Sequence, residues 1–301
     1  MSPPSLVGCF SYLASVHTLH IQQYPRINYG VEVLRSDRFL AGDGPLVAAF
    51  LTALGHPTSL TSNQVADDPA GREVLTRLNR WGITPTPSSV AVESTRVNIV
   101  ICDTDGNRTW YSGLRGIAAE LASLDLGPLV SAPVIYLDCY EALGEAPRLV
   151  LGAALDAGAE IVLNLGGSSP PQWLTTTIGE RRIAVVQTNA DNEDLSSARR
   201  GLDILTRLGI AELVIVTAGR QGALAQAGTG PMVTAPAVSV DVQQVQGAGA
   251  AFSAALIHSR DNGESLPEQL RFACAAGSLW CSHRPDDPLP TAAEITSLMR
   301  Q

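Results

Sequence analysis

Short apolar runs alternate with amphipathic helical stretches along most of this chain, and this alternation limits its fold more than any other feature. Between residues 134 and 217 the alternation becomes regular. Strands separated by helices of this length predict a parallel sheet with helices on both faces. We expect strands at residues 5–12, 58–62, 97–102, 108–111, 134–137, 160–165, 183–188, 212–217, 223–227 and 232–235, and helices at residues 44–54, 70–81, 146–157, 173–178, 194–208, 251–260, 267–281 and 292–301.

The length of the chain fits a single domain. Its 301 residues are 45% hydrophobic, which is enough to bury one large core, and no repeat or linker divides them. Asp105-Gly106 is a strong hairpin signal between two of the expected strands. We therefore expect one domain over residues 1–301, in which a small β sheet from roughly residues 12–40 and 95–115 lies beside the main sheet as a lid.

Charge and cysteine usage exclude several classes of partner. The net charge is −9 and arginines form no block, so nucleic acid and anionic membranes are poor candidates. The chain begins without a basic and apolar leader and contains no apolar run that could span a bilayer, which predicts a cytoplasmic protein. The five cysteines form no C-x-x-C pair, and neither they nor the histidines have zinc-ligand spacing.

Three glycine-rich turns lie at expected strand–helix junctions, at residues 41–45, 217–222 and 245–250. Glycines in turns usually serve backbone geometry alone. In open α/β sheets, however, ligands bind beyond the C-terminal strand ends, where the second and third turns fall. The N–H groups of the third turn begin a helix and can face an anion. An acid in the first helical turn could take a proton from a hydroxyl, but that position is Ala250.

In this order the glycine turns resemble motifs of the PfkB/ribokinase family of small-molecule kinases, over nearly the whole chain. The resemblance rests on Leu54-Gly55-His56-Pro57 followed by Val65-Ala66-Asp67-Asp68-Pro69-Ala70-Gly71-Arg72, on Asp105-Gly106-Asn107-Arg108-Thr109, on Thr217-Ala218-Gly219-Arg220-Gln221-Gly222, and on Gly247-Ala248-Gly249-Ala250-Ala251-Phe252. It implies an α/β, ribokinase-like fold with a parallel-rich central sheet, helices on both faces and a small β lid. It also implies ATP and Mg²⁺ as cofactors.

The same resemblance assigns roles to individual positions. It implies an anion hole at Gly247, Ala248 and Gly249, nucleotide contacts at Asn189, Thr217, Gly219, Gly222 and Cys274, substrate contacts at Ser11, Leu13, Gly42, Asp43, Leu46, Arg108 and Trp110, and magnesium ordered through water by Asp191 and Glu193.

The chain departs from the family pattern at several of these positions. Ala250 stands where the family has its catalytic base, and Asn192 stands where it has a glutamate that helps to order magnesium. Leu13 and Leu46 replace polar groups that would hold sugar hydroxyls, which favours a ligand less polar than ribose. Asp43 is a candidate replacement base, with a solvated turn residue as the alternative.

Two functions follow from this pattern. The first is a repurposed family member, a pseudokinase that binds a small molecule or performs non-kinase chemistry in a retained anion- and nucleotide-binding cleft. The alternative is an ATP-dependent phosphotransferase acting on a hydroxyl of a small, relatively apolar sugar- or nucleoside-like substrate, because loss of a general base costs about 10²–10⁴-fold in rate and need not abolish transfer. A homodimer through the β lid fits both, and a structural partner of an active relative is a third interpretation.

Overall fold

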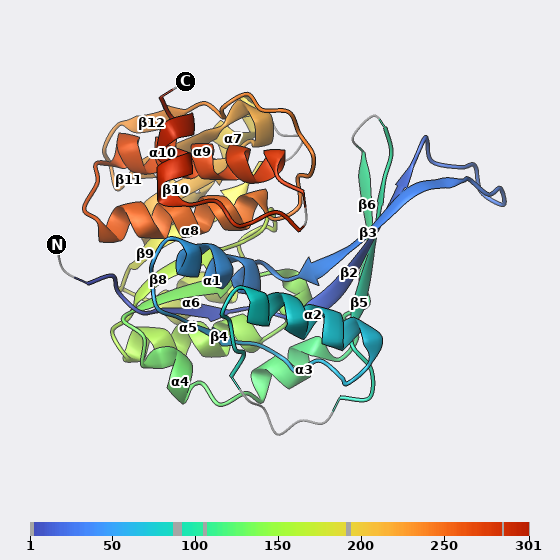
Figure 1. Ribbon diagram of the computed structural model, residues 1–301. Coiled ribbons are helices and arrows are strands. Elements are labelled where there is room, and N and C mark those ends of the chain that lie inside the picture. The colour runs from blue at the N-terminus through green and yellow to red at the C-terminus, as the bar shows by residue number, and fades with distance from the viewer. Residues whose placement is uncertain (1–2, 87–91, 105–106, 191–193, 285, 301) are drawn as a thin grey trace.

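The computed structural model describes residues 3–86, 92–104, 107–190, 194–284 and 286–300. An eight-stranded sheet forms its centre, in the order β12-β11-β10-β9-β8-β7-β1-β4. The pairs from β4 through β10 are parallel, and β11 and β12 add an antiparallel hairpin (Figure 1). The strands are β1 (Val7–Phe10), β4 (Thr58–Thr61), β7 (Val134–Asp138), β8 (Glu160–Asn164), β9 (Ile183–Asn189), β10 (Ala211–Thr217), β11 (Ala223–Ala227) and β12 (Met232–Ala235).

Helices cover both faces of this sheet, because side chains along a buried strand point alternately to opposite faces. Tyr136 of β7 belongs to one apolar cluster, and its neighbours Ile135 and Leu137 belong to the other. The first cluster includes α1 (Asp43–Ala53), α2 (Pro69–Arg80), α8 (Ala248–Asp261), α9 (Leu266–Ser282) and α10 (Ala292–Leu298), and the second includes α3 (Ile117–Ala122), α4 (Gly127–Val130), α5 (Ala146–Asp156), α6 (Trp173–Ile178) and α7 (Leu195–Leu208).

A second sheet of four strands projects from this body (Figure 1). Its order is β3 (Val33–Ala41), β2 (Ala14–Ile21), β5 (Val97–Cys102) and β6 (Arg108–Tyr111). Only the β2–β5 pair is parallel. Large apolar side chains stay exposed on this sheet and on the loop that joins β2 to β3: Ile27, Tyr29, Val31, Val33, Leu34, Val97, Ile99, Trp110 and Tyr111.

The predicted fold class, a parallel-rich sheet with helices on both faces, is confirmed. Most predicted elements occur within about three residues of their expected bounds. Two short helices, α3 and α4, were not predicted, since segments this short carry little periodicity. Helix α8 also begins at Ala248 rather than at residue 251, so the third glycine turn runs directly into it.

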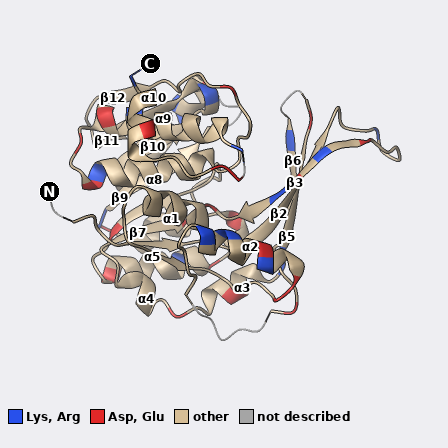
Figure 2. Ribbon diagram, in the orientation of Figure 1, with Lys and Arg blue, Asp and Glu red and all other residues tan. Residues whose placement is uncertain are grey.

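Seen from the side drawn in Figure 2, charged residues of both signs are scattered over the body and the projecting sheet. Among the described residues, no helix combines the length and the hydropathy needed to cross a bilayer.

Candidate functional site

The C-terminal ends of the parallel strands bring a row of polar side chains to one edge of the main sheet. Ser11 follows β1, Asp138 ends β7, Asn164 ends β8, Asn189 ends β9 and Thr217 ends β10. Parallel strands end at the same edge, so residues far apart in the sequence become neighbours there. This edge is also where ligands bind in open α/β sheets.

Asp138 lies fully buried at this edge, and three donors hold its carboxylate. Ser11 Oγ donates to Oδ2, the Tyr136 hydroxyl donates to Oδ1 over 2.9 Å, and the Gly44 N–H donates to Oδ2 over 3.2 Å. Burial raises the pKa of Asp138 to about 7, and the charge of Asp43 acts in the same direction, against the hydrogen bonds. Asp138 thus caps the first turn of α1 from across the sheet edge.

Asp43, the first residue of α1, is the second carboxylate of this cluster. It accepts hydrogen bonds from the Tyr140 hydroxyl and, over 3.3 Å, from Asn164 Nδ2. Asn164 Nδ2 also lies 2.9 Å from the Tyr136 hydroxyl and 3.1 Å from that of Tyr140. A continuous set of hydrogen bonds therefore joins the two carboxylates. Burial raises the pKa of Asp43 as well.

Two glycines let α1 begin against the end of β1. Gly42 has φ +108, and a Cβ built on it would lie 1.9 Å from the Tyr12 carbonyl oxygen. A Cβ on Gly44 would lie 2.6 Å from the Ser11 Cβ. Only glycine fits both positions without a shift of the backbone, and this close approach delivers the Gly44 N–H to Asp138.

Leu13 takes no part in the polar cluster. Its side chain is buried, and Asn63 holds its backbone at both polar atoms: Oδ1 accepts from the Leu13 N–H and Nδ2 donates to the Leu13 carbonyl, both over 2.8 Å.

The third glycine turn packs closely against α1 and α9. Gly247, at φ +86, caps the N-terminus of α8, and Trp280 Nε1 donates to the Gln246 carbonyl over 2.6 Å. A Cβ on Gly247 would meet Trp280 Nε1 at 2.8 Å and Leu46 Cδ1 at 3.1 Å, whereas one on Gly249 would meet open space. Leu46 lies one helical turn after Asp43, so the two residues share one face of α1.

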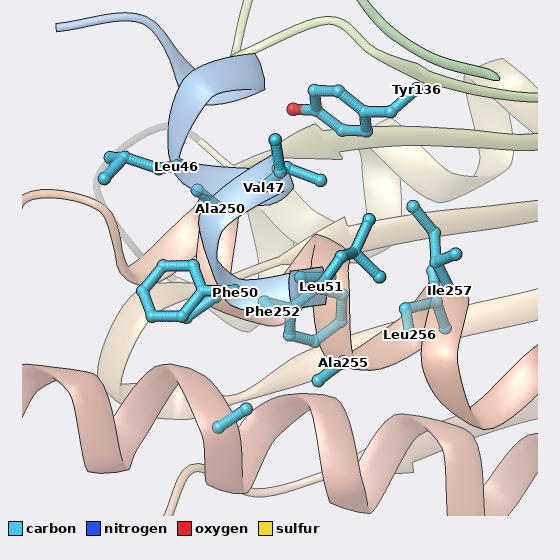
Figure 3. Packing of buried hydrophobic residues seen from close by; sticks show 14 of the residues in the cluster. Leu46, Val47, Phe50, Leu51, Tyr136, Ala250, Phe252, Ala255, Leu256 and Ile257 are labelled. Carbon is cyan, nitrogen blue, oxygen red and sulfur yellow. The ribbon is translucent and has the colours of Figure 1, made fainter. Parts of the chain in front are cut away.

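Ala250 itself faces the core. Its side chain is 0% exposed, and it lies beside Leu46 and Val47 of α1 (Figure 3). One turn later, Ser253 Oγ lies 3.1 Å from Gln187 Oε1 and 2.9 Å from the Gly249 carbonyl. The part of this first turn of α8 that lies near open space is therefore the backbone of Ala248 and Gly249. The side chain at position 250 does not lie there.

The residues expected at the nucleotide form a second group along the same edge. Asn189 is exposed, and Gly167 packs against its amide. Thr217 ends β10 with its hydroxyl 3.5 Å from the Thr188 carbonyl. Gly219 and Gly222 have positive φ, and a Cβ on Gly222 would lie 2.0 Å from the Ala235 carbonyl. These glycines shape the turn between β10 and β11.

Cys274 lies inside this region rather than on its surface. Its thiol is buried on α9, 3.6 Å from the Ala235 carbonyl, and burial raises its pKa to about 12. A nucleotide contact through this thiol stays a prediction.

The structure brings Ser11, Gly42 and Asp43 together and sets Leu46 against Gly247. It places Arg108 and Trp110 elsewhere, on the outer strand of the small sheet (Figure 1). The Arg108 guanidinium carbon lies 5.4 Å from the Trp110 ring centre, and Trp110 is 58% exposed. A role for either residue in substrate binding stays a prediction.

The predicted magnesium positions, Asp191 and Glu193, fall outside the described residues, as does Asp105-Gly106. In the parts of the chain that the structure describes, no group of three or more His, Cys, Asp or Glu side chains could hold a metal ion.

Tyr136, Tyr140 and Asn164 were not predicted from the sequence. The signal that could have found Asn164 is its place at the end of an apolar strand, next to the strand that ends in Asp138. The two tyrosines carry no such signal, because Tyr136 lies within an apolar run and Tyr140 in the loop that follows.

Known proteins resemble the chain both in sequence and in fold. A family model for pfkB family carbohydrate kinases matches residues 28–292. A 5-dehydro-2-deoxygluconokinase of Listeria monocytogenes is 34% identical over 92 residues, which is 30% of this chain but only 28% of that protein. A ribokinase of Schizosaccharomyces pombe is 24% identical over 251 residues, 79% of each chain.

Solved structures match the whole fold at lower identity. Arabidopsis thaliana ribokinase complexed with ribose and ATP has a TM-score of 0.74 at 18% identity, covering 100% of both chains. Ribokinase from Cryptococcus neoformans in complex with ADP has a TM-score of 0.79 at 16% identity, covering 97% of this chain and 99% of that one.

Proposed function

Because this chain belongs to the pfkB family of carbohydrate kinases, we propose that it binds a nucleotide or another phosphate compound at the turn Gly247-Ala248-Gly249 and a small molecule beside Asp43, without efficient phosphoryl transfer. One observation carries the proposal: the side chain at position 250 is an alanine methyl group packed in the core against α1. A methyl group cannot accept a proton, and the packing leaves that position no exposed surface.

The anion-binding half of the proposal needs backbone atoms only. The first N–H groups of α8 have no partners within the helix, and among them that of Ala248 alone has a backbone partner in the described part of the chain, the Val245 carbonyl at 3.4 Å. The positive end of the helix dipole favours a phosphate there. Gly249 has open space above it and no side chain in the way. The phosphates of ATP would lie against these groups, and we propose that Asp191 and Glu193 order Mg²⁺ through water, as their positions in the sequence predict.

The site proposed for the small molecule is mainly apolar. Leu13 and Leu46 offer no hydrogen bonds where the resemblance places sugar-binding residues, and a buried hydroxyl without a partner costs about 1–3 kcal/mol. The polar partner near this site is the half-buried Asp43 carboxylate. We therefore propose a ligand that has an apolar body and a single hydroxyl or amine directed at Asp43.

A second function, ATP-dependent phosphorylation of a hydroxyl, is favoured by the position of Asp43. This carboxylate precedes Leu46 by one turn, and Leu46 packs against Gly247. Burial raises the pKa of this carboxyl group, which makes it a stronger base than an exposed aspartate. In such a reaction Asp43 takes the hydroxyl proton, while the substrate oxygen bonds to the terminal phosphorus of ATP and ADP leaves.

Nucleotide binding and turnover separate the two functions. We expect the unchanged chain to be stabilised against heat by ADP, and its ATP consumption with a panel of hydroxyl compounds to stay at background. Asp43→Asn should then change neither the stabilisation by ADP nor the consumption of ATP. If Asp43 is instead the base, ATP consumption by the unchanged chain exceeds background and falls about 10²–10⁴-fold in Asp43→Asn, while ADP binding persists.

Two further outcomes would contradict the proposal. If both the unchanged chain and Asp43→Asn phosphorylate a substrate rapidly with ATP, the reaction needs a base at neither position 43 nor position 250. Absence of any nucleotide or pyrophosphate binding would remove the anion site. Ala250→Asp, paired with Ala250→Asn as the control for its added volume, measures whether an acid at position 250 restores transfer.

We also propose that two copies of the chain pair through the small sheet, in the reducing environment of a cytoplasm. The pairing is supported by exposed apolar residues that lie directly opposite each other, Ile99 on β5 and Tyr111 on β6. The location is supported by five free thiols, because disulfides are rare in the cytosol.

Light scattering across a dilution series tests the pairing. We expect a dimer for the unchanged chain and a monomer for Ile99→Glu, because a buried unpaired carboxylate would disrupt an apolar interface. Leu149→Glu on α5, at a similarly exposed apolar residue outside the small sheet, should leave the dimer intact. A monomeric unchanged chain at micromolar concentration would contradict the proposal.

A further inference from the structure

A cavity of about 410 Å³ lies at the far end of α1 from Asp43. The last turns of α1 and α2 form two of its sides, and the segment before α10 forms the third. It is separate from the site described above, because α1 spans 11 residues, or about 16 Å, between its two ends.

Two arginines of α2 line one side of this cavity. Arg77 Nη1 lies 3.0 Å from Asp286 Oδ1, and Arg80 Nη1 lies 3.9 Å from the same oxygen. The Arg77 side chain is only 11% exposed, and its guanidinium lies 4.6 Å from the centre of the Phe39 ring. Asp286, in contrast, is 77% exposed. A buried and a neighbouring exposed guanidinium therefore share one carboxylate oxygen that a surface segment supplies.

The other side of the cavity is apolar. Trp81 follows α2, Ala49 and Ala53 lie on α1, and Leu289 belongs to the segment before α10. The Trp81 ring is fixed edge-to-face against Phe39, with 5.9 Å between ring centres. An aromatic wall in a fixed orientation suits a flat apolar group.

The helix ends do not favour a cation in this cavity. The carbonyl oxygens of Phe50 and Leu51 in α1 accept from the Leu54 N–H, and that of Leu78 in α2 accepts from the N–H groups of Trp81 and Ile83. The strongest polar groups facing the cavity are therefore charged side chains: the guanidinium groups of Arg77 and Arg80 and the carboxylates of Asp286 and Asp287. Asp287 Oδ2 accepts from the Arg284 N–H over 2.7 Å, and Asp286 is the carboxylate that the two arginines hold. Guanidinium groups pair with carboxylate or phosphate oxygens.

We propose that this cavity is a second binding site, for a small organic anion that carries one carboxylate or phosphate group on a flat apolar body. The anionic group would lie between Arg77 and Arg80, in the place that the Asp286 carboxylate takes, and the apolar body would lie on Trp81. Asp286 then acts as a competing anion within the chain. It moves into solvent when the ligand binds, which its exposure already allows.

Calorimetric titration of the full chain with phenyl phosphate tests this site. Asp286→Asn removes the competing charge and should tighten binding about two- to fivefold, the range expected for an exposed ion pair. Arg80→Met keeps the aliphatic length but removes a guanidinium, and should weaken binding about tenfold. Arg72→Met, on the same helix but outside the cavity, should bind as the unchanged chain does.

Separate titrations with benzoate and with inorganic phosphate show whether the cavity prefers a carboxylate or a phosphate. They also show whether binding needs the apolar body of the ligand. Phosphate alone should bind more weakly than phenyl phosphate, because it makes no contact with Trp81. Phenyl phosphate would also bind at the anion site proposed for the turn Gly247-Ala248-Gly249. The effects of the variants, rather than binding alone, therefore show that the ligand occupies this cavity. Equal affinities in Arg80→Met and Arg72→Met, or no tightening in Asp286→Asn, would overturn the proposal.

Discussion

Replacing Gly42 with alanine should lower the free energy of unfolding by more than about 3 kcal/mol, the largest loss expected for any single change considered for this chain. The new Cβ would lie 1.9 Å from the Tyr12 carbonyl oxygen, and a backbone atom cannot rotate away as a side chain can. The φ of +108 is also a conformation that side-chain-bearing residues rarely adopt. Either α1 or the end of β1 must therefore move. Urea unfolding followed by circular dichroism measures the resulting loss in the free energy of unfolding.

Gly55→Ala is the matched control for this substitution. Gly55 follows α1, has a φ of +91 and would place its Cβ in open space. Alanine there should cost only the strain of a positive φ, about 1–2 kcal/mol. The difference between the two variants isolates the close approach of α1 to β1. Equal losses in both would mean that α1 does not need its contact with Tyr12.

The contribution of Asp138 to the stability of the chain should fall as pH rises from about 4 through 7, because burial raises the pKa of this residue from its ordinary value of 3.8 to about 7. Between these values the folded chain holds a proton that the unfolded chain has released. The stabilising contribution is therefore complete below pH 3.8 and is lost as pH rises through 7, with a slope of at most about 1.4 kcal/mol per pH unit for one group. The raised pKa of Asp43 acts in the same direction.

Asp138→Asn should flatten this pH dependence. Its amide oxygen can accept from Ser11 and Gly44 as the carboxylate does, and no charge remains to be buried. Urea unfolding at pH 5, 6, 7 and 8 compares it with the unchanged chain and with Asp241→Asn, which alters an exposed carboxylate. His258, whose pKa burial lowers, gives the opposite slope below pH 6.5 in all three proteins. Parallel curves for Asp138→Asn and the unchanged chain would show that Asp138 does not hold the proton.

The fold was largely accessible from local sequence patterns. Strands β5, β6, β11 and β12 and helix α6 have the bounds that the apolar runs and turn residues predict. These patterns work because side-chain periodicity directly reflects which face of an element is buried. The bounds of α8 were less accessible, since its first turn consists of glycine and alanine and carries no periodic signal.

The candidate site was accessible only in part, for a physical reason. Asp43 stands out between two glycines, but its partners Tyr140 and Asn164 lie 97 and 121 residues further along the chain. Local propensity does not determine which strand ends become neighbours; that depends on the order of strands in the sheet. Likewise, only the packing of α1 on α8 reveals that position 250 is covered.

The apolar residues on the projecting sheet make protein concentration an experimental variable for this chain. Side chains such as Ile27 and Trp110 are exposed in the single chain, and the proposed pairing of two copies would cover them. If two copies pair through this sheet as proposed, their association follows mass action, and thermal midpoints measured in a dilute fluorescence assay and in a concentrated calorimeter cell should differ even though the fold is the same. Comparisons between variants should therefore be made at one fixed concentration, well above or well below the point of half-association.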